Sequence, residues 1–285
     1  MFALEKNKSI ALVLSGGGAR GIAHVGLLKA LNDNGIYPKE ISGTSMGAII
    51  GLLYAAGLSP TEIITQIEKL KFYDLLTSFT KVRKRSLDIL YPIIKKAIGV
   101  NQFDQLKIPL HIAVSNVNYG RAEMVNKGDC IHAALASASI PFVFRAYSNN
   151  SMDFVDGGLL NNFPIDPFLR GDHAIIGCDV NYLGYVKNTN RILPYIERTF
   201  RMALFQNVRI RERFCDFLLE PKDIGNYTSF DFRSARELYD IGEKDALKNM
   251  DKLKAAIEII DHKVEQRKCL LEILQSDLIE EEREF

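Results

Sequence analysis

Short runs of consecutive apolar residues alternate with helical periodicity along the first two thirds of the chain. Residues 10–14 (Ile-Ala-Leu-Val-Leu) contain no polar position, which is typical of a strand buried on both faces of a parallel sheet. Apolar residues then recur every three or four positions over residues 21–34, which predicts a helix that stops at Asn34-Gly35. With the glycines between them, the two segments predict a strand–loop–helix unit.

Strand and helix signals of the same kind continue downstream. Further strands are predicted near Ile41 and at residues 108–117, 122–125, 174–180 and 216–219. Helices are predicted at residues 60–71 and 129–138, and most of the chain after residue 190 is also expected to be helical. Strands that alternate with helices are typical of an α/β domain.

The length of 285 residues suits one large α/β domain. We expect a single domain over residues 1–285, with a core at about residues 8–185 and a mainly helical extension at residues 190–285 that packs on the core or on a partner. A net charge of +1 argues against a nucleic-acid binder. The four cysteines are scattered and no His, Cys and carboxylate set has coordinating spacing, so we expect neither a metal nor a cofactor.

Two features of the sequence bear on where in the cell the protein is located. The first nine residues lack the basic and apolar regions of a secretion signal, which predicts a cytoplasmic protein. Residues 41–61 carry no charge and hold glycines at four-residue spacing, which imitates a membrane span. Because the strongly apolar part is limited to residues 48–58, we predict instead a helix buried on all sides in the core.

Two glycine-rich segments carry the candidate chemistry. Residues 43–47 have the form Gly-x-Ser-x-Gly, in which Gly43 and Gly47 permit a sharp strand-to-helix turn that exposes the hydroxyl of Ser45. Residues 16–21 (Gly-Gly-Gly-Ala-Arg-Gly) offer backbone N–H groups at a helix start, where developing negative charge is stabilised. A displayed serine beside such a loop indicates acyl transfer through a tetrahedral oxyanion, although an incidental serine in a tight turn would have the same local pattern.

A serine nucleophile needs a base, because an ordinary hydroxyl reacts poorly. None of the five histidines lies in a segment that marks it as a catalytic base, and His24 is expected in a packing or capping role. Asp156 is the better candidate, since it ends an apolar strand and the two glycines after it let the backbone turn closely enough for the carboxylate to meet Ser45. The alternative for Asp156 is an ordinary Asp-Gly turn.

Four motifs in order make the chain resemble the patatin-like phospholipases over residues 10–180. They are Gly16-Gly17-Gly18-Ala19-Arg20-Gly21, Gly43-Thr44-Ser45-Met46-Gly47, Ala136-Ser137-Ala138-Ser139-Ile140-Pro141-Phe142-Val143-Phe144, and Asp156-Gly157-Gly158 followed by Asn162 and Pro164. The resemblance implies a three-layer α/β/α sandwich with a mainly parallel central sheet, to which this chain adds C-terminal helices.

The resemblance also implies a serine acyl hydrolase that cleaves carboxylic ester bonds of phospholipids or related acyl lipids. By matching positions, Ser45 is the nucleophile and Asp156 is its base, in a dyad without histidine. The amides of Gly17 and Gly18 form the oxyanion hole. Arg20 steadies that loop or meets a lipid phosphate.

Three other functions compete with this interpretation. Gly16-x-Gly18-x-x-Gly21 also satisfies the dinucleotide-binding fingerprint, with Glu40 about twenty residues on as a ribose-binding acid. Glu40 lies before or at the start of its strand, however, whereas the ribose acid belongs at the strand's end. A malonyl-type acyltransferase would need a histidine that no motif positions. A non-catalytic signalling module on the same fold would normally have lost the serine or the aspartate, and both are present.

Stripes of charge and apolar residues outside the motifs predict partners. The basic residues 81–85 and the arginine-rich helix at residues 191–213 predict a transient contact with anionic lipid, or only solvated faces. Residues 71–106 are expected as surface helices near the site, where a lid could lie. The last helix, at residues 251–282, has a heptad stripe interrupted by Arg267, which predicts packing on its own domain or homodimerisation.

Overall fold

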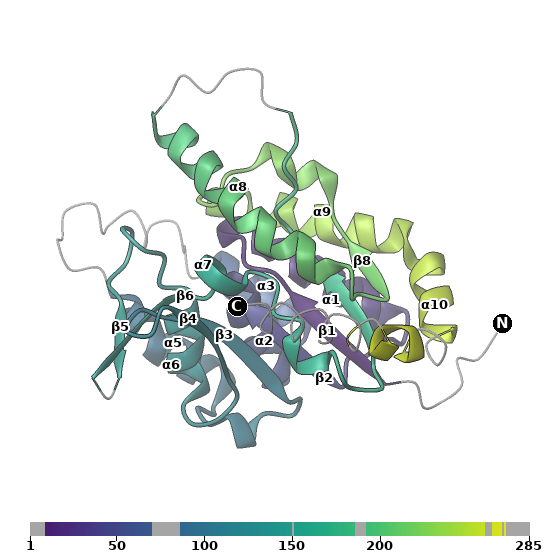
Figure 1. Cartoon of the computed structure of the whole chain (residues 1–285), viewed down its shortest axis with the longest axis horizontal. Coiled ribbons are helices and arrows are strands. Elements are labelled where there is room, and N and C mark those ends of the chain that lie inside the picture. Colours follow the sequence, from purple (N-terminus) through teal and green to yellow (C-terminus); the bar gives the residue numbers. More distant parts are fainter. Residues whose placement is uncertain are drawn as a thin grey trace, which may run out of the picture.

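A mostly parallel sheet forms the centre of the protein (Figure 1). The computed structural model describes residues 9–69, 86–149, 151–185, 192–259, 264–269 and 271. The strands are β1 (Ile10–Leu14), β2 (Glu40–Thr44), β3 (Leu110–Asn116), β4 (Arg121–Val125), β5 (Tyr147–Asn149), β6 (Met152–Asp156), β7 (Ala174–Cys178) and β8 (Phe217–Leu219). All of the predicted strands are present, and the structure adds the short, polar β5.

The parallel strands share one carboxyl edge. The order of the sheet is β5-β6-β3-β2-β1-β7-β8, with β4 also paired to β3. Strands β3, β2, β1, β7 and β8 are parallel, whereas β4 and β6 run antiparallel to β3 and β5 runs antiparallel to β6. In open α/β sheets the carboxyl edge is where ligands bind.

Strand β3 has three partners for its two edges. Ile112 and Ala113 pair with both β2 and β4, and residues 114–116 pair with both β4 and β6. Because one edge is occupied by β4 throughout, β2 and β6 lie end to end along the other edge. The last residue of β2 is opposite Ala113 and the last residue of β6 is opposite Val114, so the two strands end side by side.

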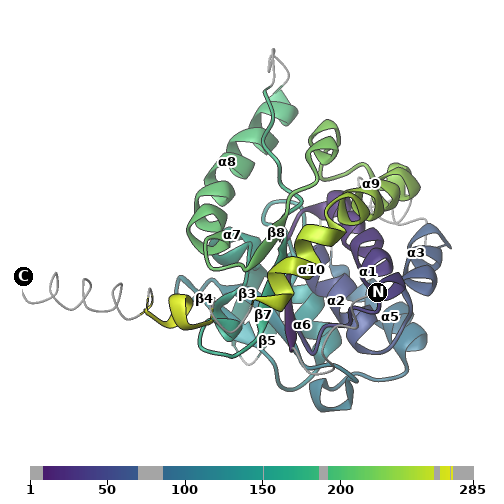
Figure 2. The ribbon, with the colours of Figure 1, turned by 90° about the vertical axis from the view of Figure 1, so that its right-hand side faces the viewer.

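Helices cover both faces of the sheet. They are α1 (Ala23–Asp33), α2 (Met46–Ala55), α3 (Pro60–Lys69), α5 (Tyr91–Ile98), α6 (Cys130–Ser137), α7 (Gly158–Asn161), α8 (Ile192–Glu212), α9 (Ala235–Lys248) and α10 (Met250–Glu258). Figure 2 shows α7 and α8 on one side of the strands and α1, α3 and α9 on the other. The fold is therefore the three-layer α/β/α arrangement, with additional helices after the core.

Alternate residues of β1 supply the two hydrophobic layers. Leu12 and Leu14 belong to the large cluster that includes α1, α2 and α9, whereas Ala11 and Val13 pack with Phe163 in a smaller cluster on the opposite face. All five residues of β1 are buried, as expected of a strand covered on both faces.

Helix α2 is buried at every one of its ten positions, which confirms the prediction of a core helix after the serine turn. It ends at Ala55, three residues before the predicted end. Among the helices that the structure describes, none combines the length and the apolar character that crossing a bilayer requires.

The region expected as surface helices lies partly outside the described residues, including the basic residues 81–85. Its described part consists of two 3₁₀ turns, Leu87–Leu90 and Phe103–Gln105, with α5 between them. Helix α5 buries Ile94 and is capped at its carboxyl end by Gly99, which adopts a φ of +76°. The described part therefore agrees with the prediction of helical structure.

The prediction of one continuous helix over residues 251–282 is wrong at its first part, because α10 ends at Glu258 and Ile259 lies in a turn. Leu253, Ile257 and Val264 are all buried in the large core cluster. Arg267, the polar position of the heptad stripe, is also buried and pairs with Asp216 at 2.9 Å. The described part of the stripe thus packs on the protein's own core, and its residues beyond 271 lie outside the described structure.

The first prediction concerns the crossing of α1 and α9, where the two backbones touch. A Cβ at Gly242 would overlap the carbonyl oxygen of Ala23, and a Cβ at Gly26 would overlap that of Tyr239. Gly242→Leu should therefore lower the free energy of unfolding by about 1–3 kcal/mol, measured by urea denaturation. Helix propensity alone would favour the leucine by up to about 1 kcal/mol, so a net loss identifies the backbone contact.

The control for this prediction is Lys244→Leu, which introduces the same side chain at an exposed position of α9. It should leave the urea midpoint near that of the original protein. Equal stability of the Gly242→Leu and Lys244→Leu variants would contradict the close crossing.

Candidate active site

Ser45 occupies a strained turn between β2 and α2. Its φ of +54° and ψ of −122° are rarely adopted by residues other than glycine. The flanking glycines are required by close backbone contacts, because a Cβ at Gly43 would lie 2.6 Å from the carbonyl oxygen of Gly47, and a Cβ at Gly47 would lie 2.6 Å from that of Ser15. The Gly-x-Ser-x-Gly pattern therefore forms the sharp turn that the sequence predicts.

The Ser45 hydroxyl contacts the carboxylate of Asp156. Ser45 Oγ donates a hydrogen bond of 2.7 Å to Asp156 Oδ2, across 111 positions of sequence. The other carboxylate oxygen, Oδ1, accepts a bond of 2.7 Å from the N–H of Gly158. Both side chains are largely buried, at 5% exposure for Ser45 and 7% for Asp156.

The last residue of α6 and the segment after it hold both of these residues in place. Ser137 Oγ accepts a hydrogen bond of 2.8 Å from the N–H of Ser45 and donates one of 2.6 Å to the carbonyl of Ala113 in β3. The N–H of Asp156 donates to the carbonyl of Ser139 at 2.9 Å. Sequence reasoning included this segment in a motif but gave Ser137 no role.

Burial makes the Asp156 carboxylate unusually basic. Loss of solvent raises the pKa of Asp156 from its ordinary value of 3.8 to about 6, and the hydrogen bonds from Ser45 and Gly158 offset only part of the increase. A carboxylate with a pKa near neutral pH is well suited to accept a proton from a hydroxyl.

The glycine loop lies next to Ser45. Gly17 precedes a 3₁₀ turn that spans Gly18–Ile22, and Gly18 adopts a φ of +58°. Gly18 and Ser45 line the same pocket. The structure thus brings together the serine, the aspartate and the loop that the sequence predicts as the site.

His24 supports the loop and does not contact Ser45 in the described bonds. Its Nε2 donates a hydrogen bond of 2.9 Å to the carbonyl of Ser15, just before the glycines. The ring is fully buried, and burial lowers the pKa of His24 to about 4. The imidazole is therefore neutral at physiological pH, in agreement with the predicted packing role.

Arg20 is buried within the loop. Its Nε donates to the carbonyl of Gly17 at 3.3 Å, and its Nη2 donates to Asn181 Oδ1 and to Ser229 Oγ, each at 3.2 Å. The carbonyl of Ser229 also accepts a bond of 2.8 Å from the N–H of Ala19. Of the two roles predicted for Arg20, these contacts support the positioning of the loop.

Two polar residues at the site were missed by sequence reasoning. Asp179 and Asn181 directly follow β7, and both are buried. Asn181 Nδ2 donates to the carbonyl of Gly16 and to Asp179 Oδ1, each at 2.7 Å, and burial raises the pKa of Asp179. Their position just past a parallel strand is the signal that could have identified them, because such residues collect at the carboxyl edge of the sheet.

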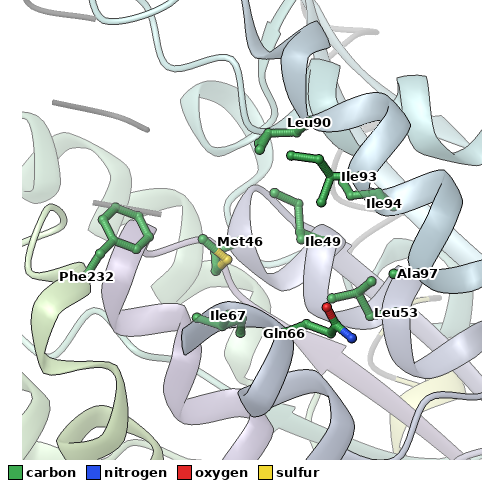
Figure 3. A pocket seen from close by; sticks show the side chains of 10 residues that line it. All are labelled: Met46, Ile49, Leu53, Gln66, Ile67, Leu90, Ile93, Ile94, Ala97 and Phe232. Carbon is green, nitrogen blue, oxygen red and sulfur yellow. The ribbon is translucent and has the colours of Figure 1, made fainter. Parts of the chain in front are cut away.

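Apolar side chains surround the serine. The pocket that contains Ser45 and Gly18 is lined mainly by apolar residues, namely Met46, Ile49, Leu87, Leu90, Ala138, Ile140, Phe144, Phe230 and Phe232, together with Ser229. A second pocket shares Met46, Ile49, Leu90 and Phe232 with it, and Gln66 is its one polar side chain (Figure 3). The shared residues make the two pockets adjoin, between α2, α3 and α5.

Glu40 lies far from the position that a dinucleotide would require. It is the first residue of β2, at the amino edge of the parallel strands. Its carboxylate faces His111 Nε2 at 3.5 Å and His173 Nε2 at 3.6 Å. A ribose-binding acid would have to follow the strand at its other end, where the chain has Ser45.

Comparison with known proteins agrees with these features. Lysophospholipase NTE1 of Yarrowia lipolytica is 30% identical over 196 residues, which cover 61% of this chain and 13% of that protein. Lysophospholipase NTE1 of Coccidioides immitis is 27% identical over 287 residues, which cover 87% of this chain and 18% of that protein. The chain therefore spans less than a fifth of the length of these relatives.

A solved structure also aligns with most of the chain. The ExoU–SpcU complex from the type III secretion system of Pseudomonas aeruginosa aligns at 20% identity and a TM-score of 0.49, over 87% of this chain and 52% of that one. The family model described as patatin-like phospholipase matches residues 12–169, which is more than half of the sequence and includes both Ser45 and Asp156. The chain therefore belongs to the patatin-like phospholipase family.

Proposed function

We propose that the protein hydrolyses carboxylic ester bonds of phospholipids or related acyl lipids, with Ser45 as nucleophile and Asp156 as base. The observation that carries the proposal is the 2.7 Å hydrogen bond from Ser45 Oγ to a buried carboxylate. The pKa of about 6 for Asp156 adds support, because the carboxylate is ionised at neutral pH yet basic enough to take a proton. The family membership supports the same chemistry.

The first half of the reaction forms an acyl-enzyme. Asp156 takes the proton of Ser45 while Oγ attacks the ester carbonyl carbon, and the carbonyl oxygen becomes an oxyanion. The N–H groups of Gly17 and Gly18 would receive that charge. When the intermediate collapses, the bond to the alkoxy oxygen breaks, and Asp156 returns its proton to the departing alcohol.

The second half releases the fatty acid. Asp156, again ionised, takes a proton from a water molecule as the water attacks the acyl carbonyl carbon. Collapse of this second oxyanion breaks the bond to Ser45 Oγ and returns the proton to it. No group besides Asp156 has to carry a proton in either half.

Pre-organisation of the glycine loop is the proposed task of Arg20. Arg20 donates hydrogen bonds to the Gly17 carbonyl, to Asn181 and to Ser229, and so joins the loop to two distant segments of the chain. An oxyanion hole works because its donors need no reorientation when charge develops. A buried guanidinium with these three hydrogen bonds suits this positioning role.

The adjoining apolar pockets support an acyl chain as the part of the substrate next to the ester. The pocket at Ser45 would hold the first carbons, and the one in Figure 3 would hold those farther along. The NTE1 relatives are named lysophospholipases. A phospholipid with a single acyl chain is therefore the first substrate to test. We also propose that the protein is cytoplasmic and contacts lipid surfaces transiently, since its substrate would be a lipid.

The nucleophile is tested by Ser45→Ala. Loss of the hydroxyl removes the attacking atom, so hydrolysis of p-nitrophenyl butyrate should fall by about 10⁴-fold or more. Circular dichroism should show an intact fold. Ser148→Ala, at an exposed serine of β5, should keep its activity. Retention of more than a tenth of the rate by Ser45→Ala would rule out the assignment.

The pH dependence tests Asp156. Since the base must be ionised, kcat/KM for a neutral soluble ester should rise with pH and reach half its plateau near pH 6, the pKa of Asp156. In Asp156→Asn the rate should be lost at every pH. A profile of the original protein that stays flat between pH 5 and 8 would contradict the role of Asp156.

The ionisation of Asp156 that raises the rate should lower the stability of the folded protein. The folded protein binds the Asp156 proton more tightly than the unfolded chain does, so ionisation of this carboxyl between pH 4 and 6 weakens the fold, by about 3 kcal/mol at neutral pH. Asp156→Asn should therefore raise the unfolding temperature at pH 7 and lose most of that advantage near pH 4. Thermal melts at the two pH values give this comparison.

Chain-length selection tests the second pocket. Ala97 is a half-buried residue of α5 that lines this pocket but not the one at Ser45. Ala97→Leu should therefore lower kcat/KM for p-nitrophenyl palmitate by about tenfold and leave the butyrate ester unaffected, because only the longer chain reaches the added side chain. An equal effect on both esters would contradict the proposed path of the acyl chain.

A further inference from the structure

Phe142 is held in an unfavourable position at the edge of the Ser45 pocket. Its side chain is fully exposed, at 106%, and its φ of +67° belongs to the left-handed region that bulky residues rarely adopt. The N–H groups of Val143 and Phe144 both donate to the carbonyl of Ile140, at 3.2 and 2.9 Å, which fixes Phe142 at the tip of a tight turn. Both conformation and exposure cost free energy, and at this exposure the described part of the chain offers the side chain no contact that offsets it.

The turn is anchored in the pocket itself. Ile140 and Phe144, which flank the tip, both line the pocket that contains Ser45. The exposed phenyl ring is therefore attached directly to the rim of the pocket, and not to a distant surface.

Two further apolar side chains are exposed at segments that line the same pocket. Phe230 is 44% exposed and lines the pocket. Ile89 is 48% exposed and lies in a 3₁₀ turn between Leu87 and Leu90, which both line it. We call Ile89, Phe142 and Phe230 the apolar rim, since they come from three separate segments that line one pocket.

We propose that the apolar rim inserts into the surface of a phospholipid aggregate and places the opening of the Ser45 pocket against it. This inference rests on the proposed lipid ester hydrolysis. Phospholipids in water are collected in membranes and micelles, so an acyl chain must leave a lipid layer to reach the apolar pocket. Direct contact between the rim and the layer would spare that chain a passage through water.

Charge around the rim points to a neutral lipid surface. Within three residues of the rim positions along the chain, the charged residues are Asp88, Arg145, Asp231 and Arg233, two acids and two bases. Their charges balance, so long-range attraction to anionic lipid is not expected from this surface. Insertion should therefore occur on zwitterionic phosphatidylcholine and change little with salt, unlike the electrostatic contact predicted from the basic segments.

The test is Phe142→Gly in the full chain. Glycine adopts a positive φ without strain, so this variant removes the phenyl ring and keeps the turn. Partition onto phosphatidylcholine vesicles, measured by flotation at 50 and 500 mM salt, should weaken by about ten- to a hundredfold at both salt concentrations. Hydrolysis of soluble p-nitrophenyl butyrate should be unchanged, because Phe142 does not line the pocket.

The matched control is Tyr37→Ser. Tyr37 is another exposed aromatic residue, at 58%, but it precedes β2 and so lies at the amino edge of the sheet, away from Ser45. Its vesicle partition should equal that of the original protein. A second rim variant, Ile89→Ser, should weaken partition in the same direction as Phe142→Gly.

Three results would overturn the inference. Equal partition of the Phe142→Gly and Tyr37→Ser variants would show that the rim does not insert. Parallel loss of soluble ester hydrolysis would show that Phe142 acts on the pocket and not at the lipid surface. A protein that ignores vesicles but forms a dimer that Phe142→Gly dissociates would assign the rim to a second copy of the chain. Flotation requires no catalysis, so these results are independent of the Ser45→Ala test.

Discussion

The two ends of β2 and β6 meet along one edge of β3, and the contact between Ser45 and Asp156 depends on that pairing. Thr44, which precedes Ser45, is opposite Ala113, and Asp156 is opposite Val114. The pairing of the sheet therefore places the ends of the two strands at neighbouring residues of β3. A one-residue slip of β6 would move Asp156 to the other face of the sheet. The register of an antiparallel pairing thus decides the geometry of the site.

The same burial that gives the site its chemistry works against the fold. Asp156 loses water on folding, which raises its pKa, and Ser45 adopts a positive φ. The surrounding backbone compensates through N–H donors and through Ser137, which joins the serine turn to β3. Strain and desolvation are concentrated at the carboxyl edge, whereas β1 and α2 are buried at every position and carry no charged residue.

Much of this arrangement could be predicted from the sequence, because the signals are local. The apolar run of β1, the Gly-x-Ser-x-Gly turn and the aspartate at the end of β6 each indicate their own local structure. Asn181 and Ser229 could not be identified that way, since only the fold brings them to Arg20, over 161 and 209 positions of sequence. The end of α10 at Glu258 could not be predicted either, because the heptad spacing continues past it. The pairing of Arg267 with Asp216 is a tertiary contact, which heptad spacing does not reveal.

The bond between Ala19 and Ser229 has a consequence for where the working unit of this protein ends. The family match stops at residue 169, yet the loop that faces Ser45 is held from residues 181 and 229 as well. A fragment cut at the last shared motif would keep the serine and the aspartate but lose Asn181 and Ser229, which both accept hydrogen bonds from Arg20. The C-terminal part is therefore a structural component of the candidate active site, and a fragment meant to keep that site intact has to extend through it.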